Sequence, residues 1–296
     1  LREAISHHFE QRYGVHYDPK DEILVTVGVS EGLAMALLAI TEPGDEVIIP
    51  DPAYVAYPAS VELAGGTPVF VPTYPEHDFK LTVEALEKVI TPKTKAIVIG
   101  YPNNPTGTVM SAEELMPIAK FAEEHDLIVL SDEIYCELMY GDAKFTSFAK
   151  LPGMRERTVI FNGFSKAYAM TGMRLGYVCA PREGLAPILK LHQYAIMCAN
   201  TTAQVGGITA LKECDDDVEA MRQEYDRRRK VIYKGLCDMG LPVFEPKGAF
   251  YIFPDIRCTG MTSAEFCEKL VQEEKVAVVP GTAFGDQGDG FRSEER

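Results

Sequence analysis

Three mostly apolar runs, each followed by a polar loop, most constrain the fold of this chain. They span residues 95–100, 127–130 and 159–161, and an amphipathic helical segment with a capping box at Ser111 and Glu114 separates the first two. Continuous apolar runs that alternate with amphipathic helices indicate a parallel sheet covered by helices on both faces. In such sheets the ligand binds at the carboxyl ends of the strands. The pattern therefore predicts an α/β fold whose site lies in the loops after these runs.

The remaining pattern predicts a second, smaller α+β domain. Residues 1–14 indicate a helix, 23–27, 46–49 and 68–71 indicate strands, and 33–40 and 54–63 indicate helices. Helical stretches dominate from residue 181 to about 240, followed by short strands at 242–244, 249–253 and 276–279 and a capped helix from Thr262. We expect an N-terminal helix within residues 1–20 that packs with the small domain, a large domain over 21–195 and a small domain over 196–296. The abrupt ends predict that residues precede Leu1 and follow Arg296.

Composition excludes several classes of function. The formal charge of −15 over 296 residues argues against nucleic-acid binding, which depends on Lys and Arg. Seven cysteines without CxxC spacing predict reduced thiols in a cytoplasmic enzyme, and neither they nor the six histidines show metal-ligand spacing. No apolar stretch approaches the roughly 18 residues that a membrane span needs. We therefore expect a globular protein with small-molecule partners, without nucleic acid, membrane or metal.

Lys166 is the residue around which the predicted site is arranged. It follows the strand at 159–161 after a break at Asn162 and Gly163, and Arg174 comes eight residues later. Burial lowers the pKa of a lysine, and a neutral amine can form a Schiff base with a carbonyl compound. Arg174 carries a permanent charge that suits phosphate. Considered alone, this pair is more typical of a surface lysine and arginine that cap ordinary elements.

Other polar residues fall at corresponding places in the chain. The turn Gly28–Gly32 between a strand and a helix can bind an anion on backbone N–H groups, although many such turns bind nothing. Singly, Asp132 could be a helix N-cap, Asn104 a turn residue and Tyr54 a core residue. Together they offer a phosphate holder, a flat aromatic ring, a carboxylate, a phenol, an amide and an amine. That set suits a phosphorylated aromatic aldehyde; its members are Gly28–Gly32, Tyr54, Asn104, Asp132, Tyr135, Lys166 and Arg174.

Three motifs in register make the resemblance specific. They are Asn103-Asn104-Pro-Thr-Gly107, Ser131-Asp132-Glu-Ile-Tyr135 and Ser165-Lys166 followed after seven residues by Arg174-Leu-Gly-Tyr177. In this order and spacing the chain resembles the class I/II aminotransferases of the bacterial aspartate/aromatic branch. These are pyridoxal 5′-phosphate (PLP) enzymes of fold type I, and the resemblance runs along essentially the whole chain. It implies a large PLP-binding domain, amino-acid and 2-oxo-acid substrates, and a homodimer.

The resemblance also implies roles for single residues. Three would be catalytic: Lys166 would bind PLP as a Schiff base and move a proton, Asp132 would pair with the ring nitrogen, and Tyr135 would hydrogen-bond the 3-oxygen. Asn104 would bind the same oxygen and the substrate. The phosphate would be held by Arg174 and by N–H groups of Val29, Ser30 and Glu31, and Tyr54 would stack on the ring.

Two expected contacts depart from the family pattern. Ser165 is a further candidate for the phosphate, but Gly163 stands where some relatives carry a serine. Arg292 is the candidate for the substrate carboxylate, although a residue normally separates the preceding aromatic from this arginine.

Two alternatives to amino transfer stay open at the level of sequence. One is a PLP-dependent carbon–sulfur lyase, although such lyases tend to carry a histidine-containing variant of the Asn-Pro motif. The other is a PLP-binding sensor domain of a transcription regulator, which would carry a DNA-binding segment upstream. The sequence does not identify the amino donor.

Overall fold

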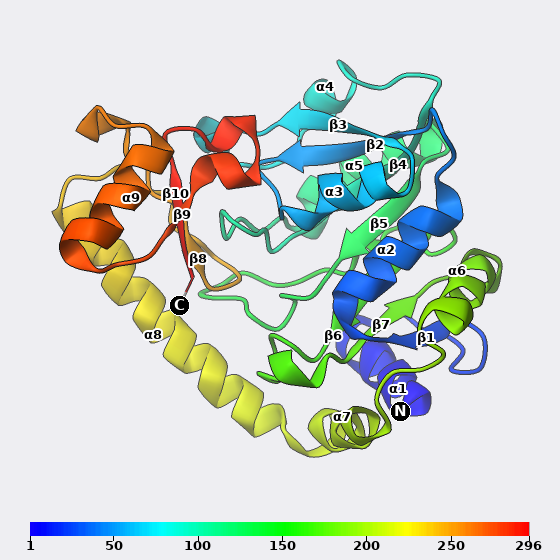
Figure 1. The fold of residues 1–296 in the computed structure, drawn as a ribbon. Helices are drawn as coiled ribbons and strands as arrows, with labels where there is room; N and C mark the ends of the chain where they lie inside the picture. The colour runs from blue at the N-terminus through cyan, green and yellow to red at the C-terminus, as the bar shows by residue number, and fades with distance from the viewer. Residues whose placement is uncertain (296) are drawn as a thin grey trace.

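A seven-stranded, mostly parallel sheet forms the centre of the molecule (Figure 1). The computed structural model describes residues 1–295, with side chains up to Ser293. The strand order is β1-β7-β6-β5-β4-β2-β3, and only β7 runs antiparallel to its neighbours β6 and β1. The strands are β1 (Ile23–Thr26), β2 (Glu46–Asp51), β3 (Thr67–Pro72), β4 (Thr94–Ile99), β5 (Ile128–Asp132), β6 (Thr158–Gly163) and β7 (Gly176–Cys179). The predicted α/β architecture is thereby confirmed.

Helices cover both faces of this sheet, and alternate residues of each strand point to opposite faces. In β4, Ala96 and Val98 pack into one core and Ile97 and Ile99 into the other. The first core lies under α2 (Gly28–Ile40), α3 (Ala56–Leu63) and α6 (Arg182–Ala195). The second lies under α4 (Val83–Leu86) and α5 (Ala112–Glu124), whose predicted capping box from Ser111 to Glu114 is present. Burial on both faces explains why these strands are continuously apolar.

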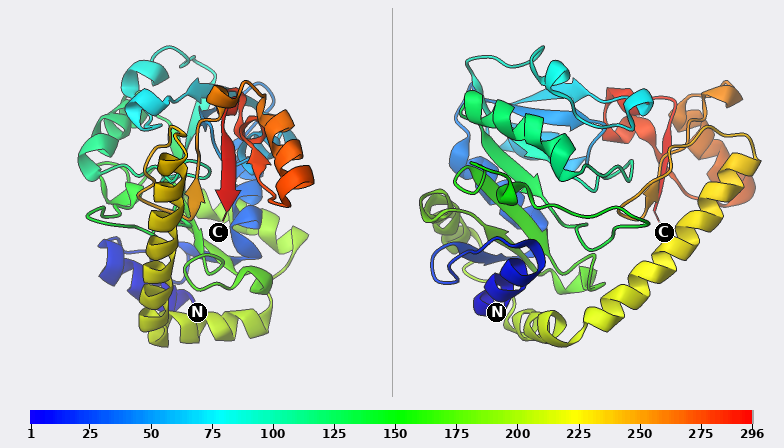
Figure 2. Two further views of the ribbon diagram at one scale, coloured as in Figure 1. Left: turned by 90° about the vertical axis from the view of Figure 1, so that its left-hand side faces the viewer. Right: turned by 180° about the vertical axis from the view of Figure 1, so that it is seen from behind.

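A second sheet has three antiparallel strands in the order β8-β10-β9. The long helix α8 runs diagonally along one side of the molecule from α7 toward this sheet (Figure 2). The elements are α7 (Thr201–Glu213), α8 (Asp215–Asp238), α9 (Ser263–Glu274), β8 (Tyr251–Ile252), β9 (Val279–Pro280) and β10 (Arg292–Glu295). Short 3-10 turns occur at Pro75–His77, Phe148–Lys150, Thr171–Met173, Arg257–Thr259, Gly281–Phe284 and Asp286–Gly288.

Several predicted boundaries differ from the observed ones. The turn predicted at 28–32 is the first turn of α2, so this helix begins earlier than expected. The predicted strand at 242–244 is reduced to one bridge between Val243 and Pro254, and the one at 249–253 to β8. Strands of two residues are too short to show the alternation on which such predictions rest.

The N-terminal helix α1 (Arg2–Tyr13) packs against both β1 and α7. Its buried side chains Ile5 and Phe9 belong to the same core as Ile23 and Ala203. The predicted division at residues 20 and 195 stays a prediction. Among the described residues, no helix is both long and apolar enough to span a bilayer.

Candidate active site

The predicted site residues converge on one cavity of about 440 Å³ at the carboxyl ends of the central strands. Nine of them line it: Val29, Ser30, Tyr54, Asn104, Asp132, Tyr135, Ser165, Lys166 and Arg174. The other lining residues are Leu33, Val55, Tyr57, Pro102, Ile134, Thr171, Tyr251, Val279, Phe284 and Ser293. Residues that lie far apart in sequence thus meet where a parallel sheet places its ligand.

Asp132 ends β5 and is buried at the floor of this cavity. Its Oδ2 accepts a hydrogen bond from Tyr57 Oη at 2.8 Å, and its Oδ1 accepts one from the Ile134 N–H at 3.2 Å. Burial raises the pKa of Asp132, although both hydrogen bonds and the charge of Lys166 act in the opposite direction. A cation placed against this carboxylate would stabilise its ionised form.

Sequence analysis missed the contribution of Tyr57. This residue lies in the first turn of α3, three positions after Tyr54, and the two rings meet edge to face at 5.5 Å. In the helix predicted over 54–63 this spacing would place both tyrosines on one face, which was the available signal, although α3 itself begins at Ala56. The Tyr57 ring is buried and its hydroxyl donates to Asp132, so Tyr57 orients this carboxylate.

Lys166 is half-buried in the loop after β6, between two aromatic rings. Its Nζ lies 4.9 Å from the centre of the Phe250 ring and 5.5 Å from that of Tyr135. The strand before it needs glycine at 163, because a Cβ there would lie 2.8 Å from Gly176 Cα. A serine at 163 is therefore excluded by the neighbouring strand, whereas Ser165 lines the cavity.

The N-terminus of α2 and Arg174 form an anion-binding corner. Helix geometry leaves the N–H groups of the first turn, including those of Val29 and Ser30, without intrahelical acceptors. Gly28 adopts a φ of 73°, and a Cβ there would lie 2.5 Å from Arg174 Nη2. The guanidinium therefore reaches the helix end only because residue 28 is glycine. Arg174 is exposed, and its Nη1 donates to Thr171 O at 3.2 Å.

Glu31 does not line the cavity, contrary to its predicted place among the phosphate contacts. Its Oε2 accepts a hydrogen bond from the Val27 N–H at 2.6 Å, and its Oε1 lies 2.7 Å from Nδ1 of the buried His192. As the fourth residue of α2, it follows the N–H groups that the helix leaves without an acceptor. Glu31 therefore caps α2 from behind the anion-binding corner.

Asn104 and Tyr135 share a partner that the sequence did not reveal. Asn104 Nδ2 donates to Tyr251 Oη at 3.1 Å, and the hydroxyls of Tyr135 and Tyr251 are hydrogen-bonded. Asn104 Oδ1 is buried and has no hydrogen-bond partner among the described residues. Because buried polar atoms are normally satisfied, this oxygen fits a site that holds a polar ligand. The cavity therefore holds the groups that PLP requires: a carboxylate, an amine, an amide and an anion-binding corner.

Arg292 does not line the cavity, contrary to its expected role in binding the substrate carboxylate. Successive side chains of a strand point to opposite sides, and in β10 it is Ser293 that lines the cavity. The guanidinium of Arg292 is buried on the other side, 5.3 Å from the Phe266 ring. The one-residue departure from the family pattern has therefore exchanged the arginine for a serine at the cavity.

The sequence and the fold both match known aminotransferases. The family model for "Aminotransferase class I and II" matches residues 1–292. The aspartate aminotransferase of Pyrococcus abyssi is 50% identical over 293 residues, which cover 98% of this chain and 75% of that protein. The aromatic-amino-acid aminotransferase 2 of Thermococcus litoralis is 48% identical, with the same shares covered.

A solved structure agrees with these relatives. That of an aromatic aminotransferase from Pyrococcus horikoshii superposes with a TM-score of 0.98 at 49% identity, covering 99% of this chain and 79% of that one. Such similarity over nearly the whole chain shows both family and fold type. The chain belongs to the class I and II aminotransferases, enzymes of fold type I that transfer amino groups.

Proposed function

We propose that this aminotransferase binds PLP in the described cavity and moves an amino group from an amino acid to a 2-oxo acid. The family is PLP-dependent, and one observation carries the proposal for this chain: Lys166 and the buried Asp132 line the same cavity of about 440 Å³. When bound, the cofactor supplies a ring that withdraws electrons from the substrate Cα. The chain supplies binding, orientation and proton transfer.

Asp132 and Lys166 have distinct parts in this proposal. The Asp132 carboxylate, oriented by Tyr57, faces the ring nitrogen and stabilises its protonated form. A positive charge there counteracts the burial that raises the pKa of Asp132. The Lys166 amine carries a proton from the substrate Cα, which is general acid–base catalysis by a positioned group. The rings of Phe250 and Tyr135 restrict where Nζ can lie.

The other lining residues support a cofactor with one charged end. The first-turn N–H groups of α2 and the guanidinium of Arg174 hold the phosphate, with Ser165 as a further donor. Tyr54 covers one face of the ring. Asn104, through the Nδ2 N–H that is not donated to Tyr251, and the Tyr135 hydroxyl donate hydrogen bonds to the 3-oxygen.

The cavity wall also bears on the amino donor. The relatives named above are aspartate and aromatic aminotransferases. On the side of the second sheet, the cavity is lined by Val279 and Phe284, and Val55 adds a third apolar side chain. Among the described lining residues, the basic ones are Lys166 and Arg174. Apolar contacts of this kind favour an aromatic over a dicarboxylic donor.

A donor and acceptor panel tests the proposal. We expect the PLP-supplemented protein to transfer the amino group of tyrosine or phenylalanine to 2-oxoglutarate faster than that of aspartate. Lys166→Ala should lower the rate by roughly 10³-fold or more, because both the covalent anchor and the proton carrier are lost. Lys144→Ala, at an exposed lysine, serves as the matched control. Borohydride reduction followed by peptide mapping should place PLP on Lys166.

Two results would contradict parts of the proposal. Release of pyruvate and sulfide from cysteine without amino transfer would favour the carbon–sulfur lyase. Reduction that labels another lysine would remove Lys166 from its role.

We also propose that the protein acts as a homodimer. The last turn of α6 and its connection to α7 expose large apolar side chains, among them Tyr194 and Met197 at 85% and 80% exposure. Neighbouring exposed apolar side chains are typical of an interface.

A further inference from the structure

Residues 247–251, here called the strap, lie against the loop that carries Asn104. The N–H groups of Lys247 and Gly248 both donate to Gly107 O at 3.0 Å. The approach is close, because a Cβ on Gly107 would lie 2.3 Å from Pro246 Cβ and one on Gly248 would lie 2.6 Å from a proline side chain. Glycine at both positions therefore lets the strap bond directly to the backbone of this loop.

The strap is also bonded to the loop that carries Tyr135. The Ala249 N–H donates to Leu138 O at 2.9 Å, and the Tyr140 N–H donates to Lys247 O at 2.9 Å. The hydroxyl of Tyr140 donates to Ala249 O. Ala249 is fully buried with a φ of 57°, a conformation that an alanine adopts only when its surroundings hold it there. The strap therefore links two loops that follow different strands.

Tyr251 ends the strap and projects its hydroxyl between the side chains of those two loops. It is buried, lines the cavity, accepts a hydrogen bond from Asn104 Nδ2 at 3.1 Å and shares one with Tyr135 Oη. Its ring packs 4.8 Å from that of Phe250, which faces Lys166 Nζ. One hydroxyl from the second sheet thus touches both groups proposed to bind the ring 3-oxygen.

We propose that Tyr251 is a positioning residue for amino transfer. Its hydroxyl holds the Asn104 amide and the Tyr135 phenol at the spacing at which both reach the 3-oxygen of PLP; this rests on the proposed function. A hydroxyl in the strap, which is bonded through its backbone to both loops, sets this spacing better than either loop could alone. Hydrogen bonds donated to an oxygen anion favour its deprotonated form, so their geometry sets the acidity of the bound cofactor.

The test is Tyr251→Phe, which keeps the ring and removes the hydroxyl. For the PLP-bound variant we expect the pH midpoint of the cofactor absorbance change to move upward by about half a unit or more. For the cofactor-free variant we expect pyridoxamine 5′-phosphate to bind about fivefold more weakly, as measured by calorimetry. The matched control is Tyr225→Phe, whose ring stacks on Phe250 at 5.4 Å and does not line this cavity.

A double-mutant cycle tests whether Tyr251 acts through Tyr135. In the Tyr135→Phe background, Tyr251→Phe should shift the pH midpoint by less than half as much as in the wild type. The inference would be overturned if wild type and Tyr251→Phe had the same pH midpoint and the same affinity for pyridoxamine 5′-phosphate. In that case the proposed function would still stand, provided that the wild type binds PLP at Lys166. A wild-type protein that binds no cofactor would overturn both. Circular dichroism should show the same folded spectrum for all variants.

Discussion

At the residue scale, burial decides the charge of the acidic residues around the site. Glu133, next to Asp132, is fully buried with Oε1 accepting hydrogen bonds from Ser131, Ser147 and the Phe148 N–H. Its Oε2 has no hydrogen-bond partner among the described residues. Burial raises the pKa of Glu133 to about 7, against the effect of those hydrogen bonds. This carboxyl therefore binds a proton more tightly in the folded than in the unfolded chain.

That difference predicts a pH dependence of stability. At pH values between the ordinary glutamate pKa and about 7, Glu133 is protonated in the folded chain but ionised in the unfolded chain. The free energy of unfolding therefore falls as the pH rises through this interval. The contribution of Glu133 to this fall in the free energy of unfolding is on the order of 3 kcal/mol. Urea unfolding from pH 5 to 8 should show the decline, and Glu133→Gln should flatten it. Asp51, whose pKa burial raises to about 6, contributes in the same direction and keeps part of the slope in the variant.

Glu124→Gln, at an exposed position on α5, is the control for this series. Parallel slopes for Glu133→Gln and wild type would show that Glu133 is ionised in the folded protein throughout.

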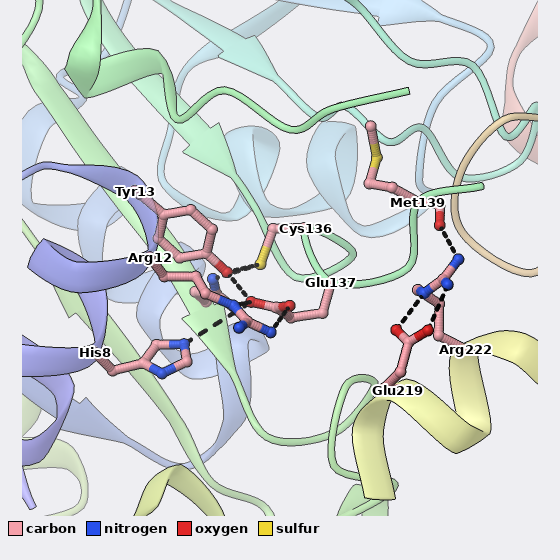
Figure 3. A network of polar contacts seen from close by, with 9 residues as sticks. His8, Arg12, Tyr13, Cys136, Glu137, Met139, Glu219 and Arg222 are labelled. Atoms are coloured by element: carbon pink, nitrogen blue, oxygen red, sulfur yellow. Dashed lines mark hydrogen bonds and ion pairs between the residues drawn. The ribbon is translucent and has the colours of Figure 1, made fainter. Parts of the chain in front are cut away.

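At the scale of elements, the loop after β5 is held from two sides (Figure 3). On one side, α1 contributes Arg12, whose Nη2 lies 2.8 Å from Glu137 Oε2 and whose Nε donates to Oε1 at 3.2 Å. Tyr13 also donates to Glu137. On the other side, Arg222 of α8 donates to Met139 O at 3.0 Å while paired with Glu219. Two helices distant in sequence thereby hold the loop that presents Tyr135.

The same loop is tied to the strand before Lys166. Cys136 Sγ lies 3.0 Å from Tyr13 Oη and accepts from Asn162 Nδ2 at 3.2 Å. Burial raises the pKa of Glu137, but the hydrogen bonds from Arg12 and Tyr13 outweigh it and bring the pKa below its usual range. The ionised Glu137 is thus the centre of the network at neutral pH.

We expect neutralisation of Glu137 to lower both the stability of the protein and its affinity for the cofactor. Glu137→Gln keeps the shape of the side chain but removes charge-assisted hydrogen bonds, which should lower the free energy of unfolding by about 2 kcal/mol. Because the loop carries Tyr135, binding of pyridoxamine 5′-phosphate should weaken as well. Glu10→Gln is the control, since its exposed pair with His16 should contribute less than about 0.5 kcal/mol. If the two variants unfold at the same urea concentration, the network does not hold the loop.

At the scale of the whole molecule, the cavity collects residues from both sheets. Asp132 ends one strand of the large sheet and Lys166 follows another, whereas Tyr251, Val279 and Ser293 belong to the small sheet. The substrate would therefore lie where the two sheets face each other, a place that ligands frequently occupy in proteins. Relative movement of these two parts would alter every contact across the cavity.

The proposed dimer predicts a measurable change in mass. Sedimentation at micromolar concentration should give a species of twice the chain mass. The double variant Tyr194→Glu and Met197→Glu should lower this mass toward that of a single chain, because buried charge destabilises an apolar interface. Met239→Glu, at an apolar residue 68% exposed beyond α8, should leave the mass unchanged. A single-chain mass for the wild type would contradict the proposal.

The long elements could be predicted from sequence because their patterns are local. The runs that became β4, β5 and β6 are buried on both faces and therefore apolar throughout. The three motifs contain six of the nine predicted residues around the cavity, and these six meet because strand ends in a parallel sheet lie at one edge. The two-residue strands β8 and β9 were predicted poorly, because their pairing depends on partners far away in the chain.

By itself, the sequence determined the layered α/β architecture, the order of its strands along the chain, and the chemical groups available at the strand ends. Only the tertiary structure decided which side chains meet: Tyr57 with Asp132, Tyr251 with Asn104, and Ser293 instead of Arg292 at the cavity. The physical reason is that hydrophobic periodicity and turn chemistry act between near neighbours, whereas the direction of a side chain depends on strand register and on how closely separate segments approach.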